Sequence, residues 1–382
     1  MNGAKVAQKS EGGIMNDISG RILTADGWVD GRVTWQDDRV AAIIPEDVPA
    51  DAPYILPGFV DLHCHGGGGA DLMEGGDAAA KIAALHARFG TTAMLATTMT
   101  DTVPAITRAM RDAGAVMAAQ APDQAAILGV HLEGPFIDRT RLGAQPDAAI
   151  PASIPLVDDF NALAPIRVVT MAPEADPEGE VTRYLDGKGI RVQIGHSSCD
   201  YETAALAFES GRHGVTHMFN AMTPLHHRAP GIVGAALAHA EHAEVIPDLL
   251  HVHPGAIRVA LRAIPNVYAV TDSCAATGMP DGDYRLGTQP VRRCGNGVRL
   301  ADGTLAGSCL TLLEAFQNFV KIGLSIEEAS ARTSTIAADY IGVWDRGRIA
   351  VGSIADMVVL SQADFSLQQV VLRGRVREGA NP

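Results

Sequence analysis

Short apolar runs alternate with alanine-rich, helix-like stretches through the middle of the chain. Eight strand-like runs lie between residues 58 and 274, and they include GFVDLHCHG, AAILGVHLEGP and NVYAVTDSC. Near-continuous apolar strands that alternate with helices indicate a parallel sheet buried on both faces. Eight such units predict a closed (β/α)8 TIM barrel, with a doubly wound open sheet as the alternative. Helices are expected at 77–89, 103–119, 200–211, 308–322 and 325–340. A polar insertion is expected at 275–305.

The two ends of the chain have a different pattern, with short alternating β segments and, near the N-terminus, two Asp-Gly pairs that favour hairpin turns. We expect the ends to pair into one small β-sandwich domain, built from 15–55 and 346–382. This leaves 56–345 as the barrel, the predicted catalytic domain. Residues 1–14, MNGAKVAQKSEGGI, are polar and precede a second methionine, so we expect a disordered extension there.

Composition narrows the class of partner. The 382 residues are 47% hydrophobic and 19% charged, which is enough for a large core, and the formal net charge is −14. An acidic chain of this kind should repel nucleic acid and anionic membranes. The sequence has no 18-residue apolar stretch and no secretory leader pattern, so no membrane partner is expected. Five scattered cysteines without a C-x-x-C pair predict reduced thiols and a cytoplasmic protein.

Polar side chains gather where the predicted strands end. His63 and His65 are two apart in a strand, so they share a face, while Cys64 should point the other way. The later strand ends carry His131, Glu133, His196, His217, Asn220, Asp248, His251 and Asp272. In a barrel these ends converge on one face, and imidazole with carboxylate suits Zn or Fe. The set as a whole predicts a metal centre, although an isolated H-x-H is also found as an ordinary strand end.

The stretches PGFVDLHCHG, GVHLEGPFI, GHSS, THMFNAMTPLHHRAPG, VTDS, LAGSCLTL and GRIAVGSIADMVVL carry a family resemblance. On them the chain resembles the amidohydrolase superfamily, and within it the N-acetylglucosamine-6-phosphate deacetylase family. The resemblance covers about residues 18–378, and HLEGPF and THMFNAM are its most specific motifs. It implies a metal-containing barrel with a small β-sandwich from both termini, in agreement with the pattern above.

The resemblance also implies ligands and an activity. Glu133, His196 and His217 would bind one divalent metal, and His63 and His65 would allow a second, so one or two ions of Zn or Fe are expected per chain. The run from 166 to 174 has no lysine, which leaves Glu133 as the available bridging group. The implied reaction is hydrolysis of the N-acetyl group of N-acetylglucosamine 6-phosphate to glucosamine 6-phosphate and acetate. Asp272 would bind metal and act as general base and then general acid, the alternatives being a metal ligand only or a helix cap.

For the substrate, an amino sugar phosphate, the resemblance implies contacts from Gln145, Asn220, Ala221, His227, Arg228 and His251. Arg228 and His251 would hold the phosphate, while His227 could equally be part of an exposed loop. Related enzymes are commonly dimers with the site near the interface, so this loop is expected to serve a neighbouring subunit of a homodimer.

Two positions depart from the family pattern. Gln145 replaces the histidine of a GAH triplet, and Leu249 replaces a glycine before His251. Both bear on the identity of the substrate more than on the class of reaction. The alternatives are therefore an amidohydrolase that acts on another N-acetyl amino sugar or an N-acyl amino acid, or a non-catalytic sugar-binding protein.

Overall fold

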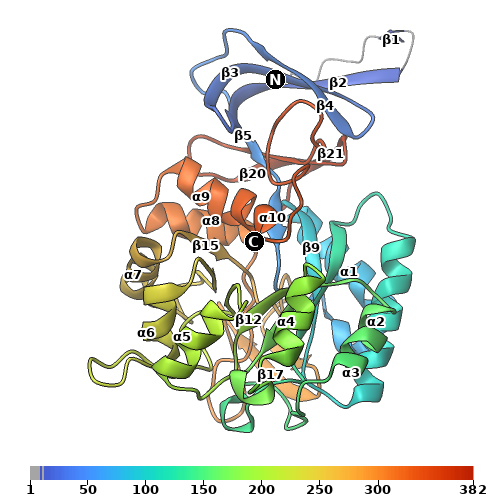
Figure 1. Cartoon of the computed structure of the whole chain (residues 1–382). Helices are drawn as coiled ribbons and strands as arrows, with labels where there is room; N and C mark the ends of the chain where they lie inside the picture. The colour runs from blue at the N-terminus through green and yellow to red at the C-terminus, as the bar shows by residue number, and fades with distance from the viewer. Residues whose placement is uncertain (1–8, 11–12, 382) are drawn as a thin grey trace.

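The centre of the molecule is a barrel of eight parallel strands (Figure 1). The computed structural model describes residues 9–10 and 13–381. In spatial order, the strands are β6 (Phe59–Asp61), β9 (Thr91–Thr98), β10 (Ala126–Glu133), β11 (Ile166–Met171), β12 (Arg191–Ile194), β13 (Gly214–Val215), β14 (His242–Val245) and β15 (Asn266–Ala269). Cys64 and Ser273, just beyond the first and last of these strands, form a parallel bridge. The Asp272 amide also donates to the His63 carbonyl at 2.8 Å. The sheet therefore closes, which confirms the barrel and excludes the open doubly wound alternative.

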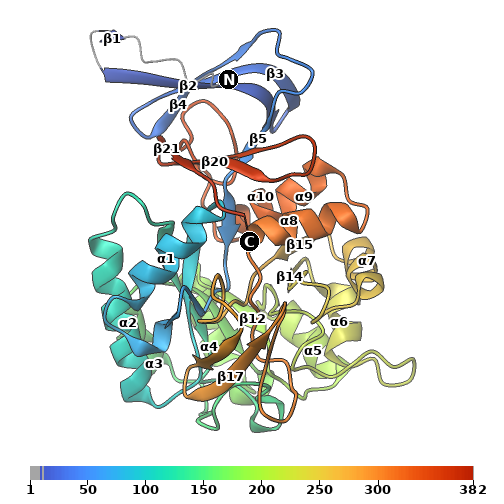
Figure 2. The same ribbon diagram turned by 180° about the vertical axis from the view of Figure 1, so that it is seen from behind.

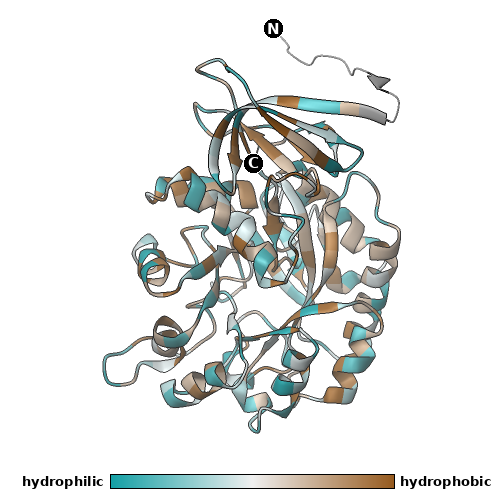
Figure 3. Ribbon diagram, turned by 45° about the horizontal axis from the view of Figure 1, so that its top comes forward, coloured by the Kyte–Doolittle hydropathy of each residue, from teal (hydrophilic) through white to brown (hydrophobic). Residues whose placement is uncertain are grey.

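Helices surround the barrel (Figures 1 and 2). They are α1 (Ala78–Arg88), α2 (Val103–Ala118), α3 (Ile154–Asn161), α4 (Glu180–Gly187), α5 (Tyr201–Glu209), α6 (Gly231–His239), α7 (Pro254–Ala263), α8 (Leu312–Lys321), α9 (Ile326–Thr333) and α10 (Thr335–Tyr340). The strands between them are mostly buried along their whole length; all eight residues of β9 are buried. Figure 3 shows both hydrophobic and hydrophilic residues along the outer helices, as expected for helices with one face on the barrel and one face outward.

The prediction of a single helix over 325–340 is wrong, because this segment forms two helices, α9 and α10, that meet at Ser334. The Ser334 hydroxyl donates to the Ser330 carbonyl at 2.5 Å. The Thr335 hydroxyl donates to the Gly347 carbonyl at 2.6 Å. Hydroxyl side chains compete with the helical ladder in this way, and the backbone at Ser334 has φ −144° and ψ −77°, which is not helical.

Segments from both termini form one eight-stranded sheet at the top of the molecule in Figure 1. Its path runs through β21 (Arg375–Glu378), β20 (Leu367–Leu372), β19 (Met357–Leu360), β5 (Tyr54–Pro57), β2 (Gly13–Thr24), β3 (Gly27–Gln36) and β4 (Arg39–Pro45), with β1 (Lys9–Ser10) paired to β2. The buried indole of Trp35 donates to the Gly374 carbonyl at 2.7 Å, which ties the two ends together. The predicted disordered extension falls largely on residues outside the described part, and the domain boundaries at 55/56 and 345/346 stay predictions.

The polar insertion after the eighth barrel strand folds as a three-stranded antiparallel sheet. Its strands are β16 (Gly282–Leu286), β17 (Gln289–Cys294) and β18 (Gly297–Arg299). Leu286 and the segment 304–307 that follows this sheet reach the cavity described below. Within the described residues, no helix is long and apolar enough to cross a membrane.

Candidate metal centre and active site

Glu133 ends β10 and lies at the middle of the site. The next residue, Gly134, has φ +72°, and a Cβ there would lie 2.0 Å from the Thr100 hydroxyl, so only glycine fits after the glutamate. Glu133 Oε1 lies 3.2 Å from His196 Nε2 and 3.1 Å from His217 Nε2. The two imidazole Nε2 atoms are 3.0 Å apart. These three residues are the ligands that the sequence assigned to the first metal.

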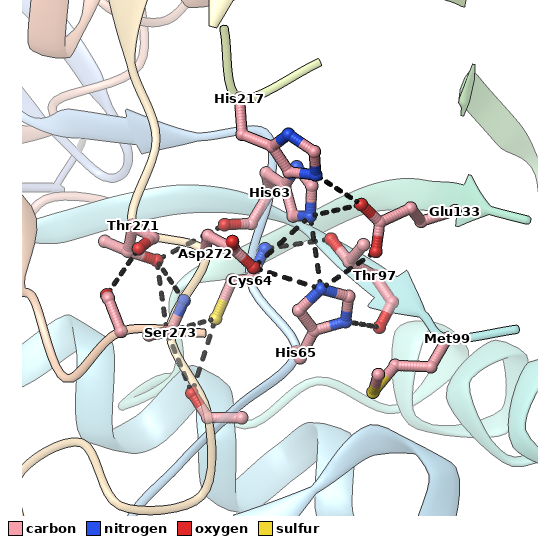
Figure 4. Close-up of polar contacts among 12 residues, drawn as sticks. His63, Cys64, His65, Thr97, Met99, Glu133, His217, Thr271, Asp272 and Ser273 are labelled. Atoms are coloured by element: carbon pink, nitrogen blue, oxygen red, sulfur yellow. Dashed lines mark hydrogen bonds and ion pairs between the residues drawn. The ribbon is translucent and has the colours of Figure 1, made fainter. Parts of the chain in front are cut away.

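His63, His65 and Asp272 form a second group beside the first (Figure 4). Asp272 Oδ1 lies 3.2 Å from His65 Nε2 and 3.6 Å from His63 Nε2. The two Nε2 atoms are 3.1 Å apart. Glu133 Oε2 is 3.2 Å from His65 Nε2, and Oε1 is 3.5 Å from His63 Nε2, so the carboxylate contacts both groups. The structure therefore gathers the other five predicted ligands around or beside the Glu133 carboxylate, in the arrangement expected of a bridge.

The donor set fits divalent metal ions. Four imidazole Nε2 atoms and two carboxylates converge, and none of these six residues is more than 9% exposed. Pairs of nitrogens about 3 Å apart repel as lone pairs unless a proton or a cation lies between them. Nitrogen and oxygen donors in this mixture suit Zn or Fe. The ligands follow five different strands, which explains why only a closed barrel can assemble them.

Backbone strain concentrates at this site. His196, His217, Phe219, Ala221, Leu249 and Asp272 all have positive φ without being glycine. Such conformations cost of order 1–3 kcal/mol each and persist where the surroundings fix them. The bends after β12, β13 and β15 turn His196, His217 and Asp272 into the barrel mouth.

The protonation of the site reflects its buried charges. Burial alone would lower the pKa of His65, but the carboxylates of Asp272 and Glu133 outweigh it and raise that pKa to about 10. Burial would raise the pKa of Asp272, yet the His63 and His65 imidazoles hold it at about 2. Asp272 is thus a carboxylate at neutral pH. The buried carboxylates of the cluster favour positively charged groups, such as protons or metal ions, at the site.

A cavity of about 210 Å³ opens beside the ligands, and five of the six, all except His63, line it. Gln145, Asn220, Ala221 and His251, four residues assigned to the substrate from the sequence, are among its lining residues. Gln145 Nε2 donates to Glu133 Oε2 at 2.5 Å, and its Oε1 accepts from the Thr100 amide at 2.7 Å. Gln145 therefore contacts a predicted metal ligand as well as the cavity.

His251 lies at another part of the same cavity. Burial lowers the pKa of His251, but the Asp248 carboxylate, 2.6 Å from Nδ1, raises it to a larger extent. Leu249, the departure from the family pattern, adopts φ +64° in the turn between these two residues. The turn thus keeps a glycine-like backbone despite the larger side chain.

His227 and Arg228 are not among the cavity residues of this chain. They lie on an exposed arm, residues 223–230, which projects from the barrel at the lower left of Figure 1 and the right of Figure 2. Arg228 Nη1 is 2.7 Å from His227 Nε2. Within one chain the structure therefore does not bring these two residues to the metal centre.

Sequence reasoning missed Glu244, a fully buried carboxylate in β14. Its Oε2 lies 2.9 Å from His63 Nδ1. It also overlooked the role of His131, whose Nδ1 and Nε2 contact the Leu62 carbonyl and the Thr170 hydroxyl beneath the site. For Glu244, the one signal in the sequence was its charge inside the apolar run AEVIP, and no motif of characteristic spacing accompanies it.

A closed barrel with histidine and carboxylate ligands at its strand ends defines the class as a metal-dependent hydrolase. Residues 54–377 match the amidohydrolase family, and the chain belongs to that family. It is 35% identical to N-acetylglucosamine-6-phosphate deacetylase of Lysinibacillus sphaericus over 96% of both chains. It is also 35% identical to N-acetylgalactosamine-6-phosphate deacetylase of Escherichia coli O157:H7, over 93% of this chain and 97% of that one.

Solved structures give the same relationship. N-acetylglucosamine-6-phosphate deacetylase of Thermotoga maritima superposes with a TM-score of 0.86 at 31% identity, over 94% of this chain and 99% of that one. A variant of the Mycobacterium smegmatis enzyme, solved with N-acetyl-D-glucosamine-6-phosphate, has a TM-score of 0.85 at 29% identity, over 94% and 97% of the two chains. The match covers the terminal sheet as well as the barrel. The chain is therefore an amidohydrolase enzyme with the complete architecture of these relatives.

Proposed function

We propose that this enzyme hydrolyses the N-acetyl group of N-acetylglucosamine 6-phosphate to glucosamine 6-phosphate and acetate. The observation that carries the proposal is that a cluster of six metal-type ligands adjoins one cavity, which Gln145, Asn220 and His251 also line. Relatives named for this reaction match the chain over nearly its whole length. No feature of the site requires a nucleic acid or membrane partner.

Glu133, His196 and His217 would hold one divalent ion, and His63, His65 and Asp272 would complete a second site. A bound Zn or Fe ion lowers the pKa of water and polarises a carbonyl oxygen. Asp272 is the group positioned to accept the proton of the attacking water, because it is ionised at neutral pH and lines the cavity. It then returns that proton to the sugar nitrogen as the C–N bond breaks, so one carboxylate serves as base and then as acid.

The phosphate end of the substrate would lie at His251. Its raised pKa keeps the imidazole protonated to a higher pH, which favours a dianionic group. Arg228 is exposed on the arm, so its contact with phosphate would be made in the cavity of a neighbouring subunit. Leu206 on α5 and Leu225 on the arm are 65% and 55% exposed, which supports a homodimer that buries this face.

We propose a cytoplasmic location, which the cysteines support. All five are free, and Cys64, Cys199, Cys274 and Cys309 are buried thiols. Burial raises the pKa of Cys64 to about 12, so this thiol is a poor nucleophile. Reduced thiols of this kind fit a cytoplasmic enzyme.

The test is acetate release from N-acetylglucosamine, N-acetylgalactosamine and N-acetylmannosamine, each with and without 6-phosphate. We expect N-acetylglucosamine 6-phosphate to rank first. Two charge-assisted hydrogen bonds of roughly 1.5–3 kcal/mol each should favour the phosphorylated sugar by about 10²-fold or more in kcat/KM. Equal rates with and without phosphate would contradict the roles of Arg228 and His251.

The galactosamine epimer is the second candidate, because the chain is as similar to the N-acetylgalactosamine-6-phosphate deacetylase as to the L. sphaericus enzyme. A preference for that epimer would change the substrate and leave the reaction intact. Activity on N-acyl amino acids alone would instead place Gln145 and Leu249 among the residues that define a different specificity.

A further inference from the structure

We propose that Glu244 is a positioning residue that commits His63 to the second metal, and so fixes the chain as a two-metal enzyme. Glu244 is not one of the six proposed ligands, and the inference rests on that ligand set. Glu244 Oε2 lies 2.9 Å from His63 Nδ1, and both side chains are fully buried. His63 Nδ1 must therefore carry the proton it donates, which leaves the Nε2 lone pair directed at Asp272 and His65.

Glu244 also reaches the other half of the centre. The same Oε2 accepts from the His217 backbone amide at 3.2 Å. That residue has φ +27°, a conformation which needs external support. The His217 Nδ1 has no hydrogen-bond partner among the described side chains and backbone, so the backbone contact is the direct link from Glu244 to His217. One carboxylate thus touches ligands from both metal groups.

A chain of hydrogen bonds inside the barrel links Glu244 to other buried groups and limits its movement. The Tyr268 hydroxyl lies 3.4 Å from Glu244 Oε1 and accepts from Gln193 Nε2 at 2.7 Å. The Gln193 carbonyl oxygen accepts from the Thr216 hydroxyl at 2.9 Å. The chain continues to Thr170, whose hydroxyl is 2.7 Å from the Thr216 hydroxyl. These groups have little room to turn away, because all are buried.

Charge favours the same conclusion. Glu244 has no arginine or lysine partner among the described residues, although a buried carboxylate without compensation is costly. Together with Glu133 and Asp272 it makes three buried carboxylates around four neutral imidazoles. Two divalent cations and one hydroxide would neutralise this set, whereas a single cation alone would leave a net charge of −1. A second cation would thus take over the compensation that protons on His63 and His65 provide in the metal-free protein.

The experiment measures Zn²⁺ binding in a metal buffer, without substrate, for the wild-type protein and Glu244→Gln. Loss of a carboxylate behind a ligating histidine typically weakens metal binding by about 10- to 100-fold. We expect that loss for the second Zn²⁺ and a smaller one for the first. At saturating Zn²⁺ the variant should regain kcat with an unchanged KM, which a misfolded site would not do.

Asp176→Asn is the matched control, because Asp176 is also buried and its carboxylate caps α4 through the Thr182 amide. It should leave both Zn²⁺ affinities unchanged. In a His63→Asn background, Glu244→Gln should no longer weaken the second site, since its effect passes through His63. Unchanged second-site affinity in Glu244→Gln, or an equal loss in the His63→Asn background, would overturn the proposal. A wild-type protein that binds no Zn²⁺ would overturn the ligand set itself.

A measurement on the wild-type protein decides the case if Glu244→Gln does not fold. Substitution with Co²⁺ shifts the imidazole N–H protons of bound histidines far from other NMR signals. The His63 Nδ1 proton should give a slowly exchanging signal, identified by its loss in His63→Asn. Its absence from the fully loaded protein would show that Glu244 does not hold that proton.

Discussion

Asp272 is the side chain that we propose to serve both in catalysis and in metal binding. Its Oδ1 contacts His65 and His63, and its carboxylate also lines the cavity. The left-handed backbone at φ +47° directs the side chain inward from the end of β15. With a pKa of about 2, it is ionised at any pH where the enzyme would work.

Asp272→Asn should therefore abolish most of the activity while the fold persists. The amide keeps the shape but cannot accept a proton, and loss of a positioned general base typically costs about 10²- to 10⁴-fold in rate. Steady-state kinetics with metal analysis on the same sample provides the measurement. A fall in kcat of less than tenfold, with metal content intact, would assign the base to another residue.

The residues of the site differ in how readily the sequence predicts their position there. His63, His65, Glu133, His196, His217 and Asp272 all follow apolar strands, and barrel geometry brings such positions to one face. Glu244 was missed because it lies inside β14, where an inward-facing charge has no periodicity to mark it. The contacts of Gln145 with Thr100 and Glu133 join distant loops, and only the folded chain specifies them.

Elements were predictable where the hydrophobic period was sustained. The alternation of apolar strands and helices predicted a parallel sheet buried on both faces, and the count of eight strands favoured a closed barrel over a doubly wound open sheet. One of the eight strand-like runs, GVTHMFNAM at 214–222, is much longer than the strand it forms, since β13 is only Gly214–Val215. Beyond it, His217, Phe219 and Ala221 have positive φ, so the site and not the strand period determines the backbone.

The arm 223–230 is the element whose proposed role in phosphate binding depends on a second subunit. Arg228→Ala should raise KM for the phosphorylated sugar by about 10- to 100-fold, the value of one charge-assisted hydrogen bond. The rate with the unphosphorylated sugar should stay constant, because the arm does not reach the metal centre of its own chain. Arg292→Ala, an exposed arginine in β17, is the control.

Mixed dimers test whether the contact is made between subunits. Arg228→Ala and Asp272→Asn chains, refolded together, should recover wild-type KM in the sites that combine an intact Asp272 with an intact arm. If Arg228→Ala lowered the activity on both sugars equally, or if the mixture did not recover the wild-type KM, the proposed role of the arm would be contradicted.

The whole molecule must balance buried charge, and the metal-free and metal-loaded forms do so differently. Without metal, Glu133, Asp272 and Glu244 are compensated by protonated imidazoles, and the pKa values of His63 and His65 are raised for this reason. With metal bound as proposed, the same nitrogens would be ligands and would carry no added proton. Proton binding and metal binding thus compete for one set of atoms.

Chelation should therefore make the stability of the fold depend on pH. The pKa of His65 is about 10 in the folded metal-free protein, against 6.5 for an ordinary histidine. A raised pKa contributes stability that is complete below pH 6.5 and is lost as the pH rises toward 10. Between pH 6.5 and 9 the metal-free protein should lose about 1–3 kcal/mol of unfolding free energy, while the Zn²⁺-loaded protein should lose much less. Urea unfolding of both forms, with a reductant to keep the thiols unchanged, measures the difference. If the unfolding free energies of the metal-free and Zn²⁺-loaded forms changed equally with pH, the proton on His65 would not be what stabilises the metal-free centre.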